Sequence, residues 1–417
     1  MTNRSLPEQS SIQRATRRPP AGRTSELPVA TSAVRRPVFG EPHGVRRIGL
    51  TPTPPRLPVS NGDRLRIGLL APPWLPVPPI GYGGTEAVVD RLARGFQQAG
   101  HHVVLFAAPG SSCPVDARSV ASFETRPLGA AVTEVRHVLA AYESFADCDI
   151  VHDHTLAGLL ESTRYPTVPT VTTCHGPFAG DLRDIYSRVS RRLSIIAISH
   201  AQARQAPEIP VAAVIHHGLD IEEFPAGSGS GGYLLFLGRM SPEKGAHRAI
   251  EIAARAGMPL VLAAKMREPA EQQYFDDFVR PKLGHGAEYV GEVAGAEKLR
   301  LLGDASALLN PIRWAEPFGL VMVEALACGT PVLTHPVGAA PEIVDHAQTG
   351  FLCQTDDELA TAAPRVSELD RSQCRAAVGR RFSTEQMVDK HLSLFDELLG
   401  SATASQSFHA AAAAARQ

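Results

Sequence analysis

The chain has 417 residues, of which 44% are hydrophobic and 20% are charged. This balance argues against a fibrous, wholly disordered or membrane-spanning protein and predicts two globular domains. The formal net charge of −2 is unevenly distributed, because residues 1–62 contain ten arginines and three glutamates and leave −9 for the rest.

Residues 1–62 are rich in Pro, Ser and Arg and show no sustained apolar periodicity. Such a segment cannot bury enough apolar surface to offset its ordering entropy, so we predict a disordered basic arm. The arm could touch nucleic acid or an anionic lipid surface. A solvated tail or an upstream start codon is the preferred interpretation, and no nucleic-acid partner is expected.

The sequence predicts a cytoplasmic protein with reduced thiols. No stretch approaches the about 18 consecutive apolar residues of a membrane span, and the N-terminus lacks the layout of a secretory signal. The six cysteines form no C-x-x-C pair, which predicts neither a zinc site nor a disulfide framework.

Strands and helices alternate from residue 63 to residue 225, which predicts a doubly wound α/β, Rossmann-like N-terminal domain. The stretch "TEAVVDRLARGFQQAG" is typical of an amphipathic helix, with Val88, Leu92 and Phe96 on one face and Gly100 at its end. Strands are expected at 65–71, 102–108, 149–152, 170–174, 194–199 and 211–215.

The segment "PAGSGSGG" at 225–232 predicts a flexible linker and a loose hinge. A second alternation predicts a Rossmann-like C-terminal domain at 226–382. Ser383 and Gln386 have the spacing of a capping box, so we expect a helix at 383–400 that packs back toward the N-terminal domain, followed by a tail at 401–417. Strands are expected at 233–238, 259–264, 287–291, 305–310 and 331–335, and helices at 244–256, 270–282 and 320–327.

The stretch "EPFGLVMVE" carries a glutamate at each end, Glu316 and Glu324. Pro317 and Gly319 disfavour a helix before residue 320, so Glu316 is expected just ahead of a helix N-terminus and Glu324 inside the helix. Free amides at that N-terminus suit a diphosphate. The two carboxylates could bind hydroxyl groups on either side of it, although Glu324 could equally be a partly buried structural carboxylate.

Four motifs occur in order: "YGGTE", the "HG" that follows "TVTTC", "LGRMSPEKG", and "EPFGLVMVE" followed by "ALACGTPV". With them the sequence from about residue 64 to 400 resembles the retaining GT-B glycosyltransferases of the large glycogen synthase-like family, group 1 of family 4. The resemblance implies two Rossmann-like domains facing across a cleft. The C-terminal domain at 226–382 would bind a nucleoside diphosphate sugar, the N-terminal domain at 63–225 would bind the acceptor, and no metal or other cofactor is implied.

The resemblance assigns roles to residues that match the motifs. Arg239 and Lys244 would meet the donor diphosphate, which agrees with their position just beyond an expected strand. Glu316 would contact the donor sugar and Glu324 the ribose. His175 would lie beside the sugar, with a structural histidine as the alternative. The implied catalytic residues are His175, Arg239, Lys244 and Glu316, and the implied donor-binding residues are Gly83, Gly84, Arg239, Lys244, Glu316, Phe318, Gly319, Leu320 and Glu324.

Two patterns resemble metal motifs and are interpreted otherwise. Asp147 and Asp149 form a D-x-D, which a different glycosyltransferase fold uses for manganese, and His152 and His154 are spaced to share one face of a strand. Asp149 opens a strand in the wrong half of what the resemblance implies to be a metal-independent architecture. The two histidines have no third and fourth ligand in register and are interpreted as cleft-lining or packed residues, so no metal site is predicted. A third pattern could give the N-terminal domain a weak peripheral membrane contact, but interleaved aspartates favour a solvated helix face. It consists of Arg183, Arg188, Arg191 and Arg192.

The sequence therefore predicts a retaining glycosyltransferase that moves a hexose from a nucleoside diphosphate sugar to a hydroxyl acceptor. UDP is favoured over GDP and ADP, and the acceptor is a sugar, a lipid-linked glycan or a small molecule. The alternatives are an epimerase or phosphorylase on the same scaffold, or a non-catalytic nucleotide-sugar binder. One departure from the family pattern is "PVGAAPE", where Gly338 and two alanines replace the more usual glycine pair, which would reshape the loop near the diphosphate.

Overall fold

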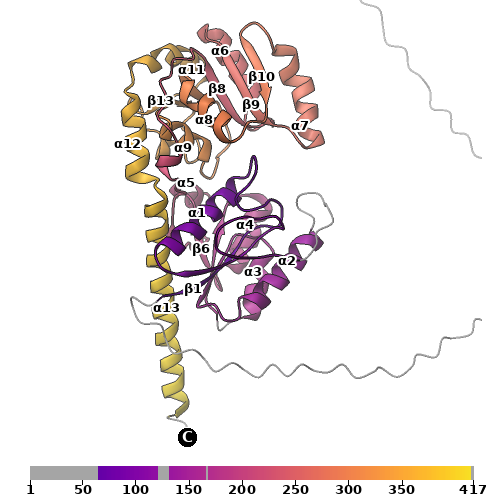
Figure 1. The fold of residues 1–417 in the computed structure, drawn as a ribbon, viewed down its shortest axis with the longest axis vertical. Helices are drawn as coiled ribbons and strands as arrows, with labels where there is room; N and C mark the ends of the chain where they lie inside the picture. The colour runs from indigo at the N-terminus through magenta and orange to yellow at the C-terminus, as the bar shows by residue number, and fades with distance from the viewer. Residues whose placement is uncertain (1–63, 121–130, 166–167, 415–417) are drawn as a thin grey trace, which may run out of the picture. The chain divides into compact units, whose positions relative to one another are not determined.

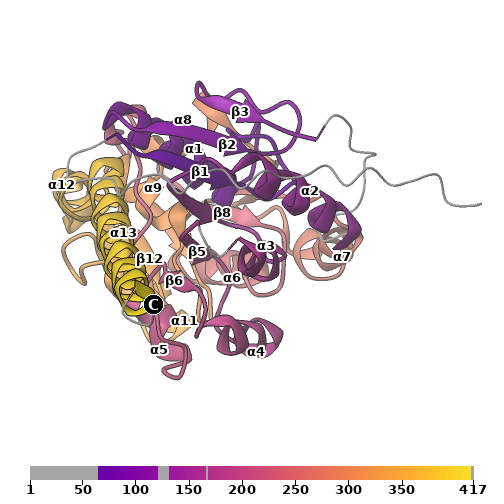
Figure 2. The same ribbon diagram turned by 90° about the horizontal axis from the view of Figure 1, so that it is seen from below.

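The computed structural model describes residues 64–120, 131–165 and 168–414, with side chains as far as Ser401. These residues belong to one compact unit, Leu57–Gln417, and they build two parallel β-sheets with helices packed on them (Figures 1 and 2). The fold is therefore the predicted pair of Rossmann-like α/β layers. The predicted arm at 1–62 lies outside the described residues.

The first sheet has seven parallel strands in the order β3-β2-β1-β4-β5-β6-β7. Alternate residues of its central strand enter different cores, with Ile67 and Leu69 on one face and Leu70 on the other, so both faces are covered. The strands are β1 (Arg66–Leu70), β2 (His102–Phe106), β3 (Asp116–Arg118), β4 (Ile150–Asp153), β5 (Thr170–Cys174), β6 (Ser194–Ala197) and β7 (Ala213–Val214). The helices are α1 (Gly84–Gln98), α2 (Ala131–Ser144), α3 (Gly158–Glu161), α4 (Gly180–Val189) and α5 (His200–Gln205).

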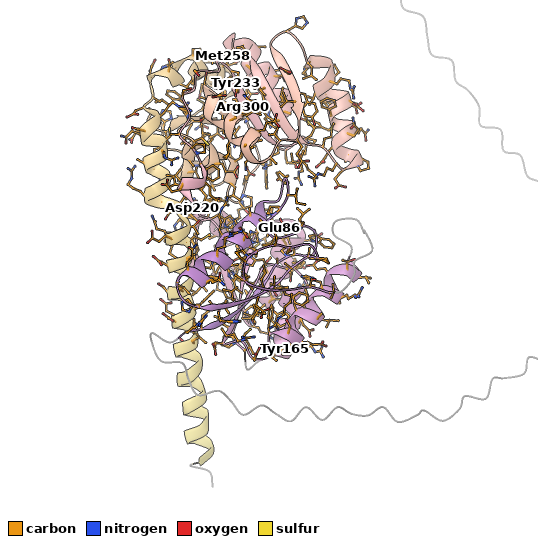
Figure 3. All side chains as sticks on the ribbon, in the orientation of Figure 1. Glu86, Tyr165, Asp220, Tyr233, Met258 and Arg300 are labelled. Atoms are coloured by element: carbon orange, nitrogen blue, oxygen red, sulfur yellow. The ribbon has the colours of Figure 1, made fainter. Side chains whose placement is uncertain are left out.

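The second sheet has six parallel strands in the order β10-β9-β8-β11-β12-β13, and packed side chains cover it as they cover the first (Figure 3). The strand β8 has the place in this order that β1 has in the first sheet. In both sheets the next two strands of the chain lie on one side of that strand and the later strands lie on the other. The strands are β8 (Leu234–Arg239), β9 (Leu260–Lys265), β10 (Ala287–Gly291), β11 (Ala307–Asn310), β12 (Val332–Thr334) and β13 (Gly350–Leu352). The helices are α6 (Ala246–Ala256), α7 (Pro269–Tyr274), α8 (Gly295–Asp304), α9 (Leu320–Ala327), α10 (Ala340–Ile343), α11 (Asp356–Ala362), α12 (Arg371–Arg381) and α13 (Thr384–Ala414).

Local sequence signals explain where these elements begin and end. Gly245 and Gly257, both with left-handed φ angles, flank α6. Thr355 caps α11 by accepting a hydrogen bond from the Glu358 amide. Beyond α7 the chain continues through a π turn at 275–279 and a 3-10 turn at 280–282, which together fill the predicted helix at 270–282.

The two strands that the sequence did not predict, β3 and β13, have three residues each. The strand β3 is Asp-Ala-Arg at the sheet edge, so it has no apolar run to signal it. The strand β13 is Gly-Phe-Leu and is too short to show a periodicity. Both predicted domain ranges contain their sheet, at 63–225 and 226–382, while the boundaries themselves remain predictions.

The prediction of a flexible linker at 225–232 is wrong. The amide of Gly227 donates to Cys328 at 2.9 Å, that of Gly229 to Gly303 at 3.0 Å, and that of Gly231 to Asp304 at 2.9 Å. A β-carbon on Gly227 would lie 2.1 Å from Gly303. The glycines of this segment therefore allow the backbone to approach the C-terminal domain closely, and their presence does not indicate mobility.

The helix α13 returns from the C-terminal domain to the first core. Leu219 bridges Ser383 where the chain crosses, and Asp220 lies beside this crossing (Figure 3). Further along α13, Val388 and Phe395 are buried in the same core as Phe96 of α1. The helix continues to Ala414, where a tail was expected. The end of the chain is rich in alanine, which has the highest helix propensity of any residue type.

Candidate active site

A cavity of about 640 Å³ lies between the carboxyl ends of the two sheets. Residues from both domains line it, including His175 beyond β5, Arg239 at the end of β8 and Asn310 at the end of β11. Open parallel sheets bind ligands at this edge. All the site residues predicted from the sequence line this one cavity.

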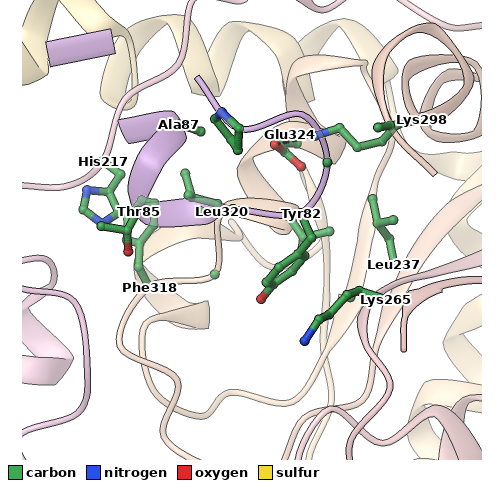
Figure 4. A pocket seen from close by; sticks show the side chains of 18 of the residues that line it. Tyr82, Thr85, Ala87, His217, Leu237, Lys265, Lys298, Phe318, Leu320 and Glu324 are labelled. Carbon is green, nitrogen blue, oxygen red and sulfur yellow. Dashed lines mark hydrogen bonds and ion pairs between the residues drawn. The ribbon is translucent and has the colours of Figure 1, made fainter. Parts of the chain in front are cut away.

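Two helix N-termini from opposite domains meet in the cavity. Figure 4 shows the start of α1, with Thr85, close to Leu320 at the start of α9. A β-carbon added to Gly84 would lie 3.5 Å from the Leu320 side chain. Both N-termini present partial positive charge, so the space between them suits an anion.

Glycine occupies the positions at these N-termini for different structural reasons. Gly319 has a φ of 104°, and a β-carbon there would lie 2.5 Å from the end of Met322. Gly83 adopts an extended φ, and its β-carbon would lie 2.6 Å from Pro79. Neither reason applies to Gly84, because its surroundings leave room for a β-carbon.

Each predicted cation of the cavity is paired with a carboxylate. Lys244 forms an ion pair with Glu316, and both side chains are only about one-tenth exposed (13% and 11%). The Lys244 ammonium also lies 5.6 Å from the centre of the Trp314 ring. Arg239 contacts Glu243 at 2.6 Å. An anionic ligand entering the cavity would compete with these carboxylates for the cations.

Two further lysines, which the sequence did not indicate, line the cavity. Lys265 ends β9 beside Arg239 in the sheet register and contacts Glu271 at 3.0 Å. Lys298 of α8 contacts Glu324 at 2.8 Å, and Figure 4 shows the two side chains reaching toward each other. Neither lysine belongs to a recognisable motif, and Lys298 meets Glu324 only because α8 and α9 pack together.

The loop after β12 fixes Glu316. The amide of Ala339 donates to the Glu316 carbonyl at 3.0 Å. Gly338 has a φ of 59°, and a β-carbon there would lie 2.4 Å from that same carbonyl oxygen. Close approach of the two backbone segments therefore requires the glycine that "PVGAAPE" retains. The Oε2 atom of the Glu316 carboxylate is buried without a hydrogen-bond partner in the described chain.

Phe318 and a set of histidines form the wall of the cavity on the N-terminal side. The Phe318 ring lies edge-on to His217 at 5.1 Å, and His217 stacks on His175 at 5.2 Å. Figure 4 shows His217 on the same side of the pocket as Thr85 and Phe318. Burial lowers the pKa of His175 to about 4 and the pKa of His217 well below its usual value, so both rings are neutral near pH 7.

The side chains of the two sequence patterns that resemble metal motifs contact other residues of the protein. Asp147 pairs with the Arg66 side chain at 3.1 Å, and Asp149 accepts a hydrogen bond from the Arg66 amide at 2.7 Å. His152 contacts the Thr173 hydroxyl at 2.8 Å and His154 contacts His175 at 2.8 Å. These contacts give all four side chains a structural explanation.

Glu342 joins the two domains beside the cavity. It accepts hydrogen bonds from the amides of His200 at 3.0 Å and Ala201 at 2.6 Å, and it contacts His216 at 2.8 Å. The α5 N-terminus of the N-terminal domain is therefore held by a carboxylate of the C-terminal domain.

The sequence matches two family models over this same region. Residues 82–223 match the model described as Glycosyltransferase Family 4, and residues 221–377 match Glycosyl transferases group 1. The fold and the site define a glycosyltransferase of GT-B architecture. The chain belongs to the group 1 glycosyltransferases of family 4.

Individual proteins agree with this family. A glycogen synthase of Mycobacterium tuberculosis is 28% identical over 373 residues, which cover 73% of this chain and 87% of that protein. The crystal structure of AviGT4, a glycosyltransferase involved in avilamycin A biosynthesis, is 27% identical with a TM-score of 0.62 and covers 81% of this chain and 98% of its own. Anabaena Alr3699/HepE, solved with UDP and glucose, is 20% identical with a TM-score of 0.65 and covers 80% and 100%. Within the described residues, no helix is both long and apolar enough to cross a membrane.

Proposed function

We propose that this glycosyltransferase moves a hexose from a nucleoside diphosphate sugar, with UDP as the favoured nucleotide, to a hydroxyl acceptor. The observation that carries the proposal is the convergence of Arg239, Lys244 and two helix N-termini beside Glu316 in one cavity. Preorganised cations and amides of this kind stabilise the charge that develops on a leaving diphosphate. The proposal therefore needs no divalent ion at the diphosphate.

In the proposed complex the diphosphate lies between the N-termini of α1 and α9. Lys244 then exchanges Glu316 for a phosphate oxygen, which frees the Glu316 carboxylate to accept hydrogen bonds from the sugar hydroxyls. Glu324 makes a similar exchange, from Lys298 to the ribose hydroxyls. In each exchange the carboxylate replaces one charge-assisted bond by another, so donor binding leaves neither Glu316 nor Glu324 without a hydrogen-bond partner.

We propose that transfer retains the anomeric configuration. The bond between the anomeric carbon and the phosphate oxygen breaks, and the acceptor oxygen bonds to the same face of that carbon. The proton of the acceptor hydroxyl passes to the departing phosphate, so the chain supplies no base of its own. Family resemblance supports this course, and the neutral His175 beside the sugar position is compatible with it.

UDP is favoured because it occurs widely in the family, and a neighbour of the same fold was solved with UDP. A sugar, a lipid-linked glycan or a small molecule would serve as acceptor. An epimerase or phosphorylase on this scaffold would use the same donor site. Release of nucleoside diphosphate only when an acceptor is present would distinguish a transferase from both, and from a protein that binds the donor without turnover.

The first test is calorimetric titration of UDP, GDP and ADP into the protein in EDTA. We expect one nucleotide to bind, and we expect Lys244→Met to weaken that binding at least tenfold, because the diphosphate loses a charge-assisted partner. His285→Asn is a matched control, since His285 lies outside the cavity at a φ of 50° that asparagine tolerates. Absence of binding by every nucleotide to folded protein would refute the donor site.

Turnover of the corresponding nucleotide sugars is then measured with a panel of hydroxyl acceptors. Proton NMR of the product gives the anomeric configuration directly. Product with the donor's configuration supports retention, whereas the opposite configuration would refute it. Full activity in EDTA is expected, and activity that depends on added Mg²⁺ or Mn²⁺ would refute metal independence.

A further inference from the structure

His154 and His175 lie side by side at the carboxyl ends of two neighbouring strands. His154 follows β4 and His175 follows β5, and these strands pair in parallel. The Nδ1 atom of His154 is 2.8 Å from the Nε2 atom of His175, and the ring centres are 5.1 Å apart. His175 lines the cavity, whereas His154 is buried behind it with 6% exposure.

One proton lies between these two nitrogens, and its position decides what His175 offers to a ligand. Burial lowers the pKa of both rings, so each is neutral near pH 7 and carries a single N–H. If His175 donated from Nε2, the N–H of His154 would have to lie on its own Nε2. That atom is buried without a hydrogen-bond partner in the described chain, and a buried donor without a partner is unfavourable.

The opposite arrangement avoids this cost. When His154 carries its proton on Nδ1 it donates to Nε2 of His175, and only a lone pair of His154 is left unused. His175 must then carry its own proton on Nδ1. That atom has no hydrogen-bond partner among the described residues, and His175 is one of the residues that line the cavity, so Nδ1 is the ring nitrogen left to serve a ligand.

We propose that His154 is a positioning residue that fixes the tautomer of His175, so that His175 presents a hydrogen-bond donor to the bound substrate. A second ring also packs on His175, because His217 stacks on it at 5.2 Å with an angle of 24° between the rings. The donor is therefore fixed in both identity and direction. The inference rests on the proposed function only for the identity of the substrate.

This arrangement restricts the chemistry of His175. Its Nε2 lone pair is occupied by His154, so His175 cannot take a proton from the acceptor hydroxyl. Its Nδ1–H instead donates to an oxygen acceptor, which in the proposed complex is a hydroxyl or ring oxygen of the transferred sugar. The proton of the acceptor must therefore leave by another route, as the proposed transfer to the departing phosphate provides.

Nitrogen NMR of the ligand-free protein tests the tautomer without reference to activity. The protein is labelled with ring-¹⁵N histidine, and the His175 signals are assigned by their loss in His175→Asn. We expect the shift of a protonated nitrogen at Nδ1 and of an unprotonated one at Nε2. A protonated Nε2 on His175 would overturn the proposal, whether or not the protein transfers a sugar.

A pair of variants tests the consequence for turnover. Asparagine and leucine have similar shapes, but only His154→Asn keeps a donor near the position of Nδ1. We expect His154→Leu to lower kcat about 10- to 100-fold, as loss of a second-layer partner typically does, and to mix the two tautomers of His175. We expect His154→Asn to recover most of that loss, while UDP without a sugar binds all variants equally.

The outcomes separate this inference from the proposed function. Equal kcat values for the asparagine and leucine variants, at equal thermal stability, would overturn the role of His154. If His175 carries its proton on Nδ1 but the protein turns over no nucleotide sugar, the proposed function is refuted and the positioning role of His154 stands. His285→Asn serves again as the control and should match the unmodified protein in every measurement.

Discussion

The ion pair of Lys244 and Glu316 allows stability and catalysis to be separated by a double-mutant cycle. Both side chains are about one-tenth exposed, and Glu316 Oε2 already lacks a partner in the described chain. Lys244→Met leaves the Glu316 carboxylate buried without its cation. Breaking one side of a buried pair typically costs about 3 kcal/mol or more.

For a chain of this size, 1 kcal/mol corresponds to roughly 2 °C in the thermal midpoint. We therefore expect Lys244→Met to lower the midpoint by about 6 °C. Adding Glu316→Gln removes the stranded charge while keeping the shape of the side chain, so the double variant should recover to within about 2 °C of the unmodified protein.

Turnover should behave differently. Both groups act on the donor in the proposed mechanism, so each single variant and the double variant should lose about 100- to 1,000-fold in kcat. The three losses should be similar, because residues that act as a unit are not additive. Scanning calorimetry and nucleotide release from the donor sugar supply the two measurements.

Two results would refute this reasoning. An unchanged midpoint in Lys244→Met would mean that the pair is not a buried ion pair in solution. Recovery of turnover in the double variant, together with recovery of stability, would mean that the single variants fail only because they unfold.

Three further predictions follow from other parts of the chain. Gly338→Ala should lower kcat at least tenfold by displacing Glu316, whereas Gly284→Ala, at a φ of 84° with open space around it, should only lose stability; equal kcat values would contradict this. Burial lowers the pKa of His137 and His391 to about 4, below the unfolded value of about 6.5. Unfolded protein then binds more protons between these values, so the free energy of unfolding should fall by up to about 1.4 kcal/mol per pH unit for each group as pH drops from about 6.5 to about 4. His391→Leu should reduce the slope of the free energy of unfolding against pH, and an unchanged slope would contradict this prediction. All six thiols are buried, so an aromatic disulfide reagent should titrate none in native protein and all six after unfolding.

The fold could be predicted wherever the hydrophobic pattern was long enough to carry a period. Buried parallel strands such as β1 and β9 are continuous apolar runs, and α1 shows a clear apolar face. The three-residue strands β3 and β13 gave no such signal. At the linker, composition was misleading, because glycine permits both mobility and close packing, and only the contact of Gly227 with Gly303 shows which applies.

The site could be predicted as far as its motifs extend. Residues such as Arg239 and Glu316 follow strands or precede a helix, and the carboxyl ends of parallel strands gather at one edge. The partner of each residue could not be predicted, because pairs such as Lys298 with Glu324 join segments that are distant in sequence. The same reason hid the contact of His154 with His175, although the sequence had drawn attention to both histidines.

The return of α13 into the first core means that the boundary between the halves of the molecule is not a single point in the chain. Met387, Val388 and Phe395 are part of the wall against which α1 packs. A chimera that exchanges the N-terminal half between relatives by one cut near residue 225 would leave that half facing a foreign helix. Exchange of the N-terminal half therefore requires a second cut near residue 383, so that α13 is inherited together with α1.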